Sequence, residues 1–190
     1  MSWRAARVVL WEGLVNTIEA LRTRRTNKKF TATPVPREIL LELVDAARYS
    51  PSGANKNPWR FIIVTQRESL DRLSQAHPYC RWLEMAQAAI AIVVDPASTR
   101  YWLEDCSVAA YGIWLAARAH GLAMAWAAMH QADDLAESER RQKVVREALS
   151  VPEGLYVPIV LGVGYADSSV PERKRPALED VVCWDRYTLP

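Results

Sequence analysis

The sequence predicts a single domain of the α+β class, and three observations support this prediction. Segments with a helical spacing of apolar residues alternate with short runs of β-branched residues along the chain. Half of the 190 residues are hydrophobic, which is enough to build one sizeable core. The sequence contains no internal repeat, low-complexity tract or linker that would divide it. We therefore expect one domain that spans residues 1–190.

The first two predicted elements are helices. Apolar residues recur at helical spacing over residues 5–22, which predicts the first helix. Pro36 suits the first turn of the second helix, whose apolar face comprises Ile39, Leu40, Leu43, Val44 and Ala47. This helix is expected to end before Pro51, because proline disfavours a helical conformation in the residue that precedes it.

The middle of the chain predicts two strands and two helices. The β-branched runs at residues 59–65 and 89–94 predict buried strands, and residues 68–76 between them predict a short helix. Residues 102–120 form a predicted helix that is apolar nearly all round, so we expect it to be buried inside the domain or inside an oligomer. Gly121 suits the end of this helix.

Three further elements complete the predicted domain. Residues 122–128 and 156–165 predict strands, and residues 138–149 between them predict a helix. Pro158 cannot donate a backbone hydrogen bond, so it indicates that the last strand begins irregularly or lies near a sheet edge.

Composition argues against several classes of protein. The 24 basic and 22 acidic residues give a net charge of +2, too balanced for a general nucleic-acid binder. The longest uncharged apolar run, residues 106–117, is shorter than the roughly 20 residues needed to cross a bilayer. We recognise no secretory leader, and Cys80, Cys106 and Cys183 are too few and too widely spaced for a disulfide framework. We therefore expect a cytoplasmic protein without nucleic-acid or membrane partners. The three histidines show no metal-ligand spacing, so we predict no metal site.

Three polar segments stand out. Residues 22–30, RTRRTNKKF, place five cations within eight residues, and residues 171–176, PERKRP, form a second basic cluster. Residues 50–61, SPSGANKNPWRF, combine two prolines with serines and asparagines and contain no acid. Any one of these segments more often indicates a solvated surface or an ordinary loop. If the fold brings the two basic clusters together, however, they would form an anion site, because guanidinium groups bind phosphate with two hydrogen bonds each. The sequence contains neither a P-loop nor a Rossmann motif.

Four stretches together resemble the flavin-dependent nitroreductase family in their order and spacing: RTRRTNKKF, PSGANKNPWRF, EDCSVAAYGIWLAARAHGLAMAW and LGVGY followed by RKRP. The resemblance extends from about Leu14 to Val182 and leaves residues 1–13 as an N-terminal extension. It implies a nitroreductase-like fold with a central, mostly antiparallel sheet flanked by helices. It also implies FMN as the cofactor and an intertwined, obligate homodimer in which the two subunits share each active site.

The resemblance assigns roles in cofactor binding to matching positions at both ends of the chain. Arg24 and Thr26 would bind the FMN phosphate, whereas Arg25 and Lys28 would reach the ribityl chain and the pyrimidine edge of the flavin. A cation at that edge would stabilise the negative charge that reduction places there. From the C-terminal end, one of two arginines would close on the phosphate: Arg173 or Arg175.

The resemblance also places a loop and a backbone amide near the flavin. The loop would come from the other subunit and cover the flavin with Pro51, Ser52, Gly53 and Asn55. The alternative is that this loop only caps the preceding helix. Ala128 and Met129 stand where the family usually has a glycine whose backbone amide faces the flavin. The amide survives this change, but the Met129 side chain would either crowd the ring or point into the core.

The implied chemistry belongs mostly to the cofactor, so we assign no catalytic side chain. NADH or NADPH would donate electrons, and a small nitroaromatic or quinone-type acceptor would receive them in a ping-pong mechanism. Tyr101, Trp102 and Tyr111 are candidates to line the pocket, although aromatic residues in such a helix more often belong to the core. Two alternatives remain open: a specialised enzyme on the same fold, flavin-modifying or dehalogenating, and a non-catalytic flavin-binding module.

Overall fold

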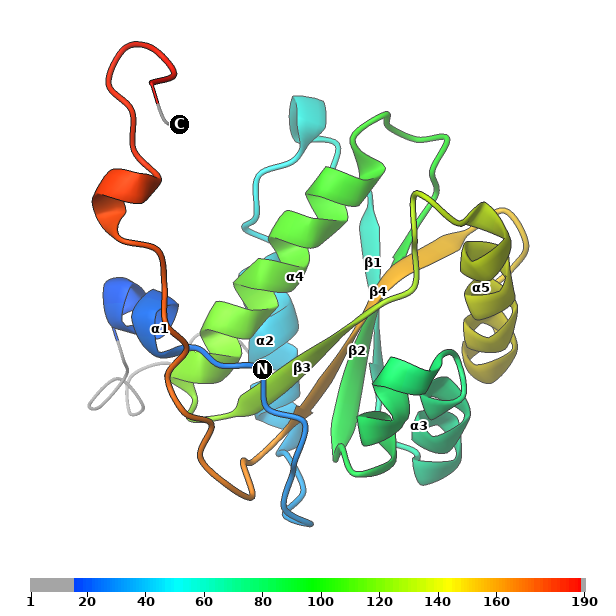
Figure 1. Ribbon diagram of the computed structural model, residues 1–190. Helices are drawn as coiled ribbons and strands as arrows, with labels where there is room; N and C mark the ends of the chain where they lie inside the picture. The colour runs from blue at the N-terminus through cyan, green and yellow to red at the C-terminus, as the bar shows by residue number, and fades with distance from the viewer. Residues whose placement is uncertain (1–15, 189–190) are drawn as a thin grey trace, which may run out of the picture.

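The computed structural model describes residues 16–188. These residues form a four-stranded sheet, and helices cover both of its faces (Figure 1). The strands are β1 (Trp59–Val64), β2 (Ala88–Val94), β3 (Ala123–Ala128) and β4 (Tyr156–Gly164). Their order in the sheet is β1-β2-β4-β3, and every neighbouring pair is antiparallel. The predicted α+β class and the mostly antiparallel sheet are therefore confirmed.

The helices form two layers. Helices α1 (Thr17–Thr23), α2 (Arg37–Ala47) and α4 (Trp102–Ala119) lie on one side of the sheet, and α3 (Arg67–Ser74) and α5 (Leu135–Leu149) lie on the other (Figure 1). Short 3-10 helices span Gly53–Asn55, Pro78–Glu84 and Leu178–Asp180. Each predicted helix corresponds to one of these elements, but the part of the first prediction that precedes residue 16 lies outside the described residues.

The sheet divides the hydrophobic core into two clusters. The cluster under α2 and α4 includes Leu43, Ile90 and Ile113, and the cluster under α3 and α5 includes Leu73 and Val145. Strand β2 lies between the two clusters, and all seven of its residues are buried. Burial on both faces explains why this strand is a continuous apolar run in the sequence instead of an alternating one.

Pro158 lies in an internal strand, so of the two expectations for this residue the edge position is wrong. The irregular start is confirmed, because the register between β2 and β4 shifts between Ile92 and Val94, opposite the proline. A shift of this kind accommodates a residue that has no backbone N–H to donate. The Pro158 carbonyl remains in use and accepts a hydrogen bond from the Met129 N–H at 2.7 Å.

Within residues 16–188, we find no helix whose length and hydropathy would allow it to cross a membrane. The same residues contain no group of three or more histidine, cysteine or acidic side chains arranged to hold a metal ion.

Candidate functional site

The fold brings the first basic segment against the chain that follows β4. The Asn27 side chain donates a hydrogen bond to the Ser168 carbonyl at 2.8 Å, and its backbone N–H donates to the Met124 carbonyl on edge strand β3 at 2.9 Å. Arg25 forms an ion pair with Glu172 at 3.1 Å. The segment after α1 is thereby fixed between β3 and the C-terminal part of the chain.

A hollow of about 270 Å³ lies where these segments meet, and we call it the arginine hollow. Three parts of the chain line it: the end of α1 and the residues after it, the end of α4 and the start of β3, and residues 166–170. Its cationic lining residues are Arg24, Arg25 and Arg118. No acidic residue is among the lining residues of this hollow within the described chain. The electrostatic potential in the hollow therefore favours an anion.

Arg24 is held in the hollow by aromatic side chains. Its guanidinium carbon lies 5.0 Å from the centroid of the Trp114 ring and 5.9 Å from that of Tyr111, and both rings belong to α4. The Arg24 Nε is shielded from solvent and has no hydrogen-bond partner among the described residues. A buried donor without a partner costs free energy, so the contacts of the described residues leave the Arg24 guanidinium group incompletely satisfied.

The other residues predicted from the first basic segment differ in how they are held. The Arg25 Nη1 donates to the carbonyls of Arg22 and Arg24 at 2.7 and 2.9 Å, so this side chain closes the turn after α1. Thr26 and Lys28 are exposed, and Thr26 forms an isolated backbone bridge with Met124 of β3. Arg25 therefore has a structural task besides its predicted one, while the side chains of Thr26 and Lys28 remain accessible to a ligand.

Arg173 and Arg175 do not line the arginine hollow. Both are exposed, in a segment that leaves the sheet and stands apart from it (Figure 1). The C-terminal residue that reaches the first basic segment is their neighbour Glu172. Within one chain, the first basic segment thus contacts an acidic side chain and backbone groups of the C-terminal part, and not the arginines of the second cluster. These two arginines remain candidates, without a described contact to the hollow.

The loop with Pro51, Ser52, Gly53 and Asn55 lies at the opposite end of α4. The Gly53 N–H donates to Asp105 Oδ1 at 2.9 Å, and the Ser52 Oγ accepts a hydrogen bond from the Asn57 N–H at 2.9 Å. A Cβ atom at Gly53 would come within 2.5 Å of the Tyr101 ring, so any larger residue here would force that ring to move. Asp105 and Arg118 are separated by thirteen residues of one helix, or about 20 Å at the helical rise. The loop therefore does not line the arginine hollow of its own chain.

The loop also has an unusual backbone. Ala54, Asn55 and Asn57 all have positive φ angles, of 51°, 54° and 46°. Such angles are unfavourable for residues other than glycine and occur where the surrounding contacts impose them. The Asp105 Oδ2 is buried and has no hydrogen-bond partner among the described residues. The strained backbone and the buried carboxylate are more than a helix cap requires, which favours a functional role for the loop.

Met129 belongs to the core. Its side chain is fully buried in the cluster under α3 and α5, so of the two expected placements the one in the core is confirmed and the side chain does not crowd a ligand. Because hydrogen bonding alternates along a strand and the Met129 N–H bonds to Pro158, the Ala128 N–H turns toward the open edge of β3. Ala128 is exposed, so it presents an accessible backbone amide at this edge.

Replacing Met129 by alanine is expected to lower the free energy of unfolding by about 2–5 kcal/mol, because it leaves a cavity in a closely packed core. Urea unfolding of the purified protein measures this loss. Met85 is a matched control: it is 47% exposed, and its replacement by alanine is expected to change stability by no more than about 0.5 kcal/mol. An altered preference between large and small electron acceptors at unchanged stability would show instead that Met129 faces the substrate.

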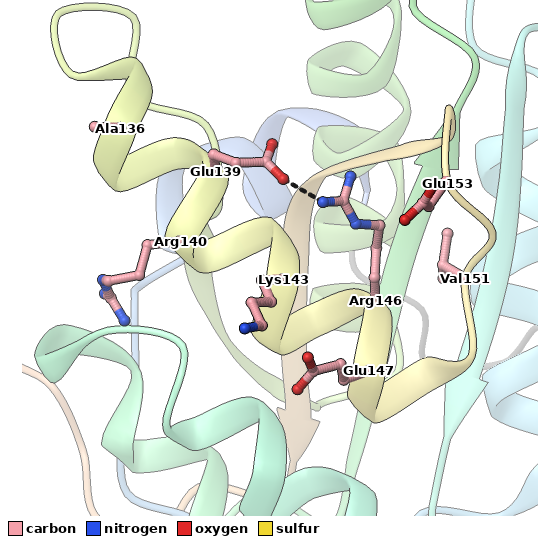
Figure 2. Close-up of a pocket in the computed structure, with 8 residues that line it drawn as sticks. All are labelled: Ala136, Glu139, Arg140, Lys143, Arg146, Glu147, Val151 and Glu153. Carbon is pink, nitrogen blue, oxygen red and sulfur yellow. Dashed lines mark hydrogen bonds and ion pairs between the residues drawn. The ribbon is translucent and has the colours of Figure 1, made fainter.

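A larger hollow of about 730 Å³ lies on the outer face of α5 (Figure 2). It contains none of the residues that the sequence predicted for a site. Three acids and three bases line it, and Glu139 pairs with Arg146 across it. Its charges balance and partly satisfy one another, which is typical of a solvated surface.

Residues with strongly shifted pKa values lie outside the arginine hollow. Burial raises the pKa of Cys106 to about 12 and lowers that of His77 to about 4, so both side chains are neutral near pH 7. Hydrogen bonds from Arg140 and Arg141 lower the pKa of Glu137 to about 2. None of these three residues lines the hollow, so among the described residues the hollow has the character of a binding site more than that of an acid–base centre.

Sequence reasoning missed four residues that shape these two regions: Asn27, Asp105, Trp114 and Arg118. Asn27 lies inside the basic segment and only its neighbours were assigned roles. A usable signal existed for Arg118 and Asp105, since a charged residue in a helix that is otherwise apolar all round has to be paired or functional. Trp114 carried no separate signal, because an aromatic residue in such a helix is expected in the core.

Comparisons with known proteins identify relatives of this chain. Residues 21–78 and 75–165 match the nitroreductase family. A provisionally named NADH dehydrogenase/NAD(P)H nitroreductase from Methanothermobacter thermautotrophicus is 32% identical over 178 residues, which are 92% of this chain and 87% of the relative.

Solved structures show the same likeness over most of the chain. A provisionally named NADH dehydrogenase/NAD(P)H nitroreductase from Bacteroides thetaiotaomicron superposes with a TM-score of 0.82 at 29% identity, over 90% of this chain and 98% of that one. An FMN-dependent nitroreductase from Clostridium difficile R20291 superposes with a TM-score of 0.78 at 30% identity, over 90% and 99% of the two chains. Sequence and fold agree over nearly the whole described chain, and the protein therefore belongs to the nitroreductase family.

Proposed function

We propose that this protein is an FMN-dependent oxidoreductase that uses NAD(P)H to reduce small nitroaromatic or quinone-type acceptors. The observation that carries the proposal is the arginine hollow, which three arginines and no acid of the described chain line, in a protein of the nitroreductase family. A phosphate monoester fits such a hollow, because its oxygens accept several charge-assisted hydrogen bonds at once. The name of the Clostridium difficile relative, an FMN-dependent nitroreductase, supports the choice of FMN.

The residues around the hollow have distinct tasks in this proposal. Arg24, fixed against Trp114, binds the phosphate, and the exposed hydroxyl of Thr26 adds a further donor. Lys28 is exposed beyond them and supplies a positive charge toward the flavin ring, while the Ala128 amide offers a donor at the open edge of β3. Arg173 or Arg175 closes on the phosphate when the C-terminal segment folds back. Bound FMN supplies the redox chemistry, which consists of accepting a hydride from the nicotinamide and passing it on to the acceptor.

A ping-pong mechanism is part of this proposal. The sequence has no Rossmann fingerprint or P-loop that would hold the nicotinamide nucleotide elsewhere. The donor and the acceptor are therefore expected to occupy the same face of the cofactor in turn. The balanced charge of the chain and its buried thiols Cys80 and Cys106 fit a cytoplasmic location.

We further propose an obligate homodimer in which each site takes its cations from one subunit and its covering loop from the other. The C-terminal arm, residues 170–188, stands away from the sheet and exposes large apolar side chains, with Trp184 84% and Tyr187 81% exposed (Figure 1). On α4, Val108 and Tyr111 are exposed too. Apolar surface of this kind marks a protein interface. The separation of about 20 Å between the loop and the arginine hollow along α4 supports a loop that serves the neighbouring subunit.

An anaerobic titration tests the proposed reaction. Purified protein reconstituted with FMN is expected to be yellow, to bleach on addition of NADH or NADPH, and to regain its colour with a quinone or a nitroaromatic compound. Free FMN at the same concentration serves as the control. Protein that stays yellow with both nucleotides would be a flavin-binding module and not an enzyme. Protein that bleaches but does not recover its colour with either acceptor would favour a specialised reaction on the same fold.

A further inference from the structure

The last turns of α4 present a stripe of three side chains to the segment after α1. Tyr111, Trp114 and Arg118 are spaced by three and four residues, so they lie on one face of the helix. The first two hold Arg24 through their rings, and Arg118 lines the arginine hollow beside it. One face of α4 thus positions one guanidinium group of the hollow and contributes a second one.

Of the three nitrogen atoms of the Arg118 guanidinium group, Nε is hydrogen-bonded and the two Nη atoms are not, among the described residues. Its Nε donates to the Thr23 Oγ1 at 3.0 Å, and that hydroxyl in turn donates to the Glu19 carbonyl at 2.7 Å. Both Nη groups of Arg118 have no hydrogen-bond or ion-pair partner among residues 16–188. The hydroxyl therefore orients the guanidinium group and leaves its fork of donors available, which is the arrangement that binds a phosphate with two hydrogen bonds.

The unpaired positive charge around the hollow is similar in magnitude to the negative charge of a phosphate monoester. Of its three arginines, only Arg25 has an acidic partner, Glu172, whose side chain is 75% exposed. Arg24 and Arg118 remain without acidic partners within the described chain. A monoester carries a charge of about −1.5 to −2 at pH 7, which matches two guanidinium groups. A single partly exposed cation would not distinguish a monoester from a neutral ligand as strongly.

We infer that Arg118 is a phosphate-binding residue of the arginine hollow and that, together with Arg24, it makes the site select a flavin with a terminal phosphate monoester over riboflavin. The inference rests on the proposed function, because it takes FMN as the ligand. Arg118 is the one cation in the second half of α4, and the apolar character of the helix does not explain its presence. Phosphate binding would explain it. The alternative is a structural role, since a cation in the last turn of a helix also interacts favourably with the helix dipole.

The test is a titration of apoprotein with FMN and with riboflavin, in which the quenching of flavin fluorescence measures binding. Arg118→Gln is expected to weaken FMN binding about tenfold or more and to leave riboflavin binding unchanged, because only FMN carries the phosphate. Arg118→Lys keeps the charge without the fork, so it should lose less affinity. Arg22→Gln is the matched control: Arg22 is an exposed arginine of the last turn of α1, it does not line the hollow, and its replacement should leave both affinities unchanged.

Each outcome decides between the two roles of Arg118. Equal loss of FMN and riboflavin binding, or loss of thermal stability of the apoprotein with unchanged FMN affinity, would overturn the inference in favour of a structural role. If Arg118→Gln did not fold, Thr23→Val would replace it, since it releases the guanidinium group and should still weaken FMN binding selectively. Wild-type protein that binds FMN no better than riboflavin would reject the proposed phosphate site itself, whereas normal selectivity of both wild type and Arg118→Gln would reject only the role of Arg118.

Discussion

Replacing Arg24 by alanine is expected to lower the affinity for FMN by about ten- to a hundredfold. The change removes a charge-assisted contact worth about 1.5–3 kcal/mol in the proposed complex. It also removes the group that fills the space beside Trp114 and Tyr111, so the loss is expected to exceed that at Arg118. Equilibrium titration of apoprotein with FMN measures the change directly.

Arg48 offers a matched control for this substitution. Its guanidinium carbon also lies over an aromatic ring, 6.0 Å from the centroid of Tyr49, but the residue is exposed and does not line the arginine hollow. Arg48→Ala should therefore leave FMN affinity unchanged. Mass spectrometry of the cofactor released on denaturation completes the test, since a phosphate surrounded by the cations of the hollow would leave little room for an adenylate. The release of FAD, or the absence of any flavin after reconstitution, would contradict the proposal.

The sequence predicted most secondary-structure elements because their local signals agree with their tertiary surroundings. Strand β2 is apolar throughout and is buried on both faces, and the helix that begins after Pro36 buries Leu40, Leu43 and Ala47 from its predicted face. Pro158 shows the limit of such reasoning. A proline within a strand indicates an irregular hydrogen-bond ladder, but whether the strand lies at the edge or inside depends on partners that come from distant parts of the chain.

The candidate site could be predicted only where one segment carries several chemically related residues. The basic segment indicated the region, the family resemblance assigned roles to Arg24 and Arg25 within it, and both residues line the hollow. Arg118 also lines the hollow. Its charge in an apolar helix was a signal that it is paired or functional, but only the packing of α4 against the end of α1 shows which site it belongs to. Arg173 and Arg175 illustrate the opposite case. Their predicted contact depends on the position of the C-terminal arm, in which both side chains are exposed and away from the hollow.

A mixed dimer tests the shared site most directly. One variant carries Arg24→Ala, and a second carries Ser52→Ala together with Asn55→Ala. Each homodimer has two damaged sites and is expected to bind FMN poorly. The two variants, expressed with different affinity tags, are combined and the mixed dimer is isolated through both tags. The single variants mixed without exchange of subunits serve as the control, because they contain the same lesions in separate dimers.

If the subunits share their sites, both lesions of the mixed dimer fall in the same site. The other site then takes its cations from the loop variant and its loop from the Arg24 variant, and it is intact. The mixed dimer should therefore bind one FMN tightly and recover about half of the wild-type activity. Within one chain, Gly53 is bound to Asp105 near the start of α4 while Arg24 packs on Trp114 toward its end, which is why we expect the loop to serve the neighbouring subunit. If each chain instead completes its own site, every site in the mixed dimer carries one lesion. A mixed dimer with no more activity than its parents would thus reject the shared site and, with it, the proposed role of the strained loop at residues 50–61.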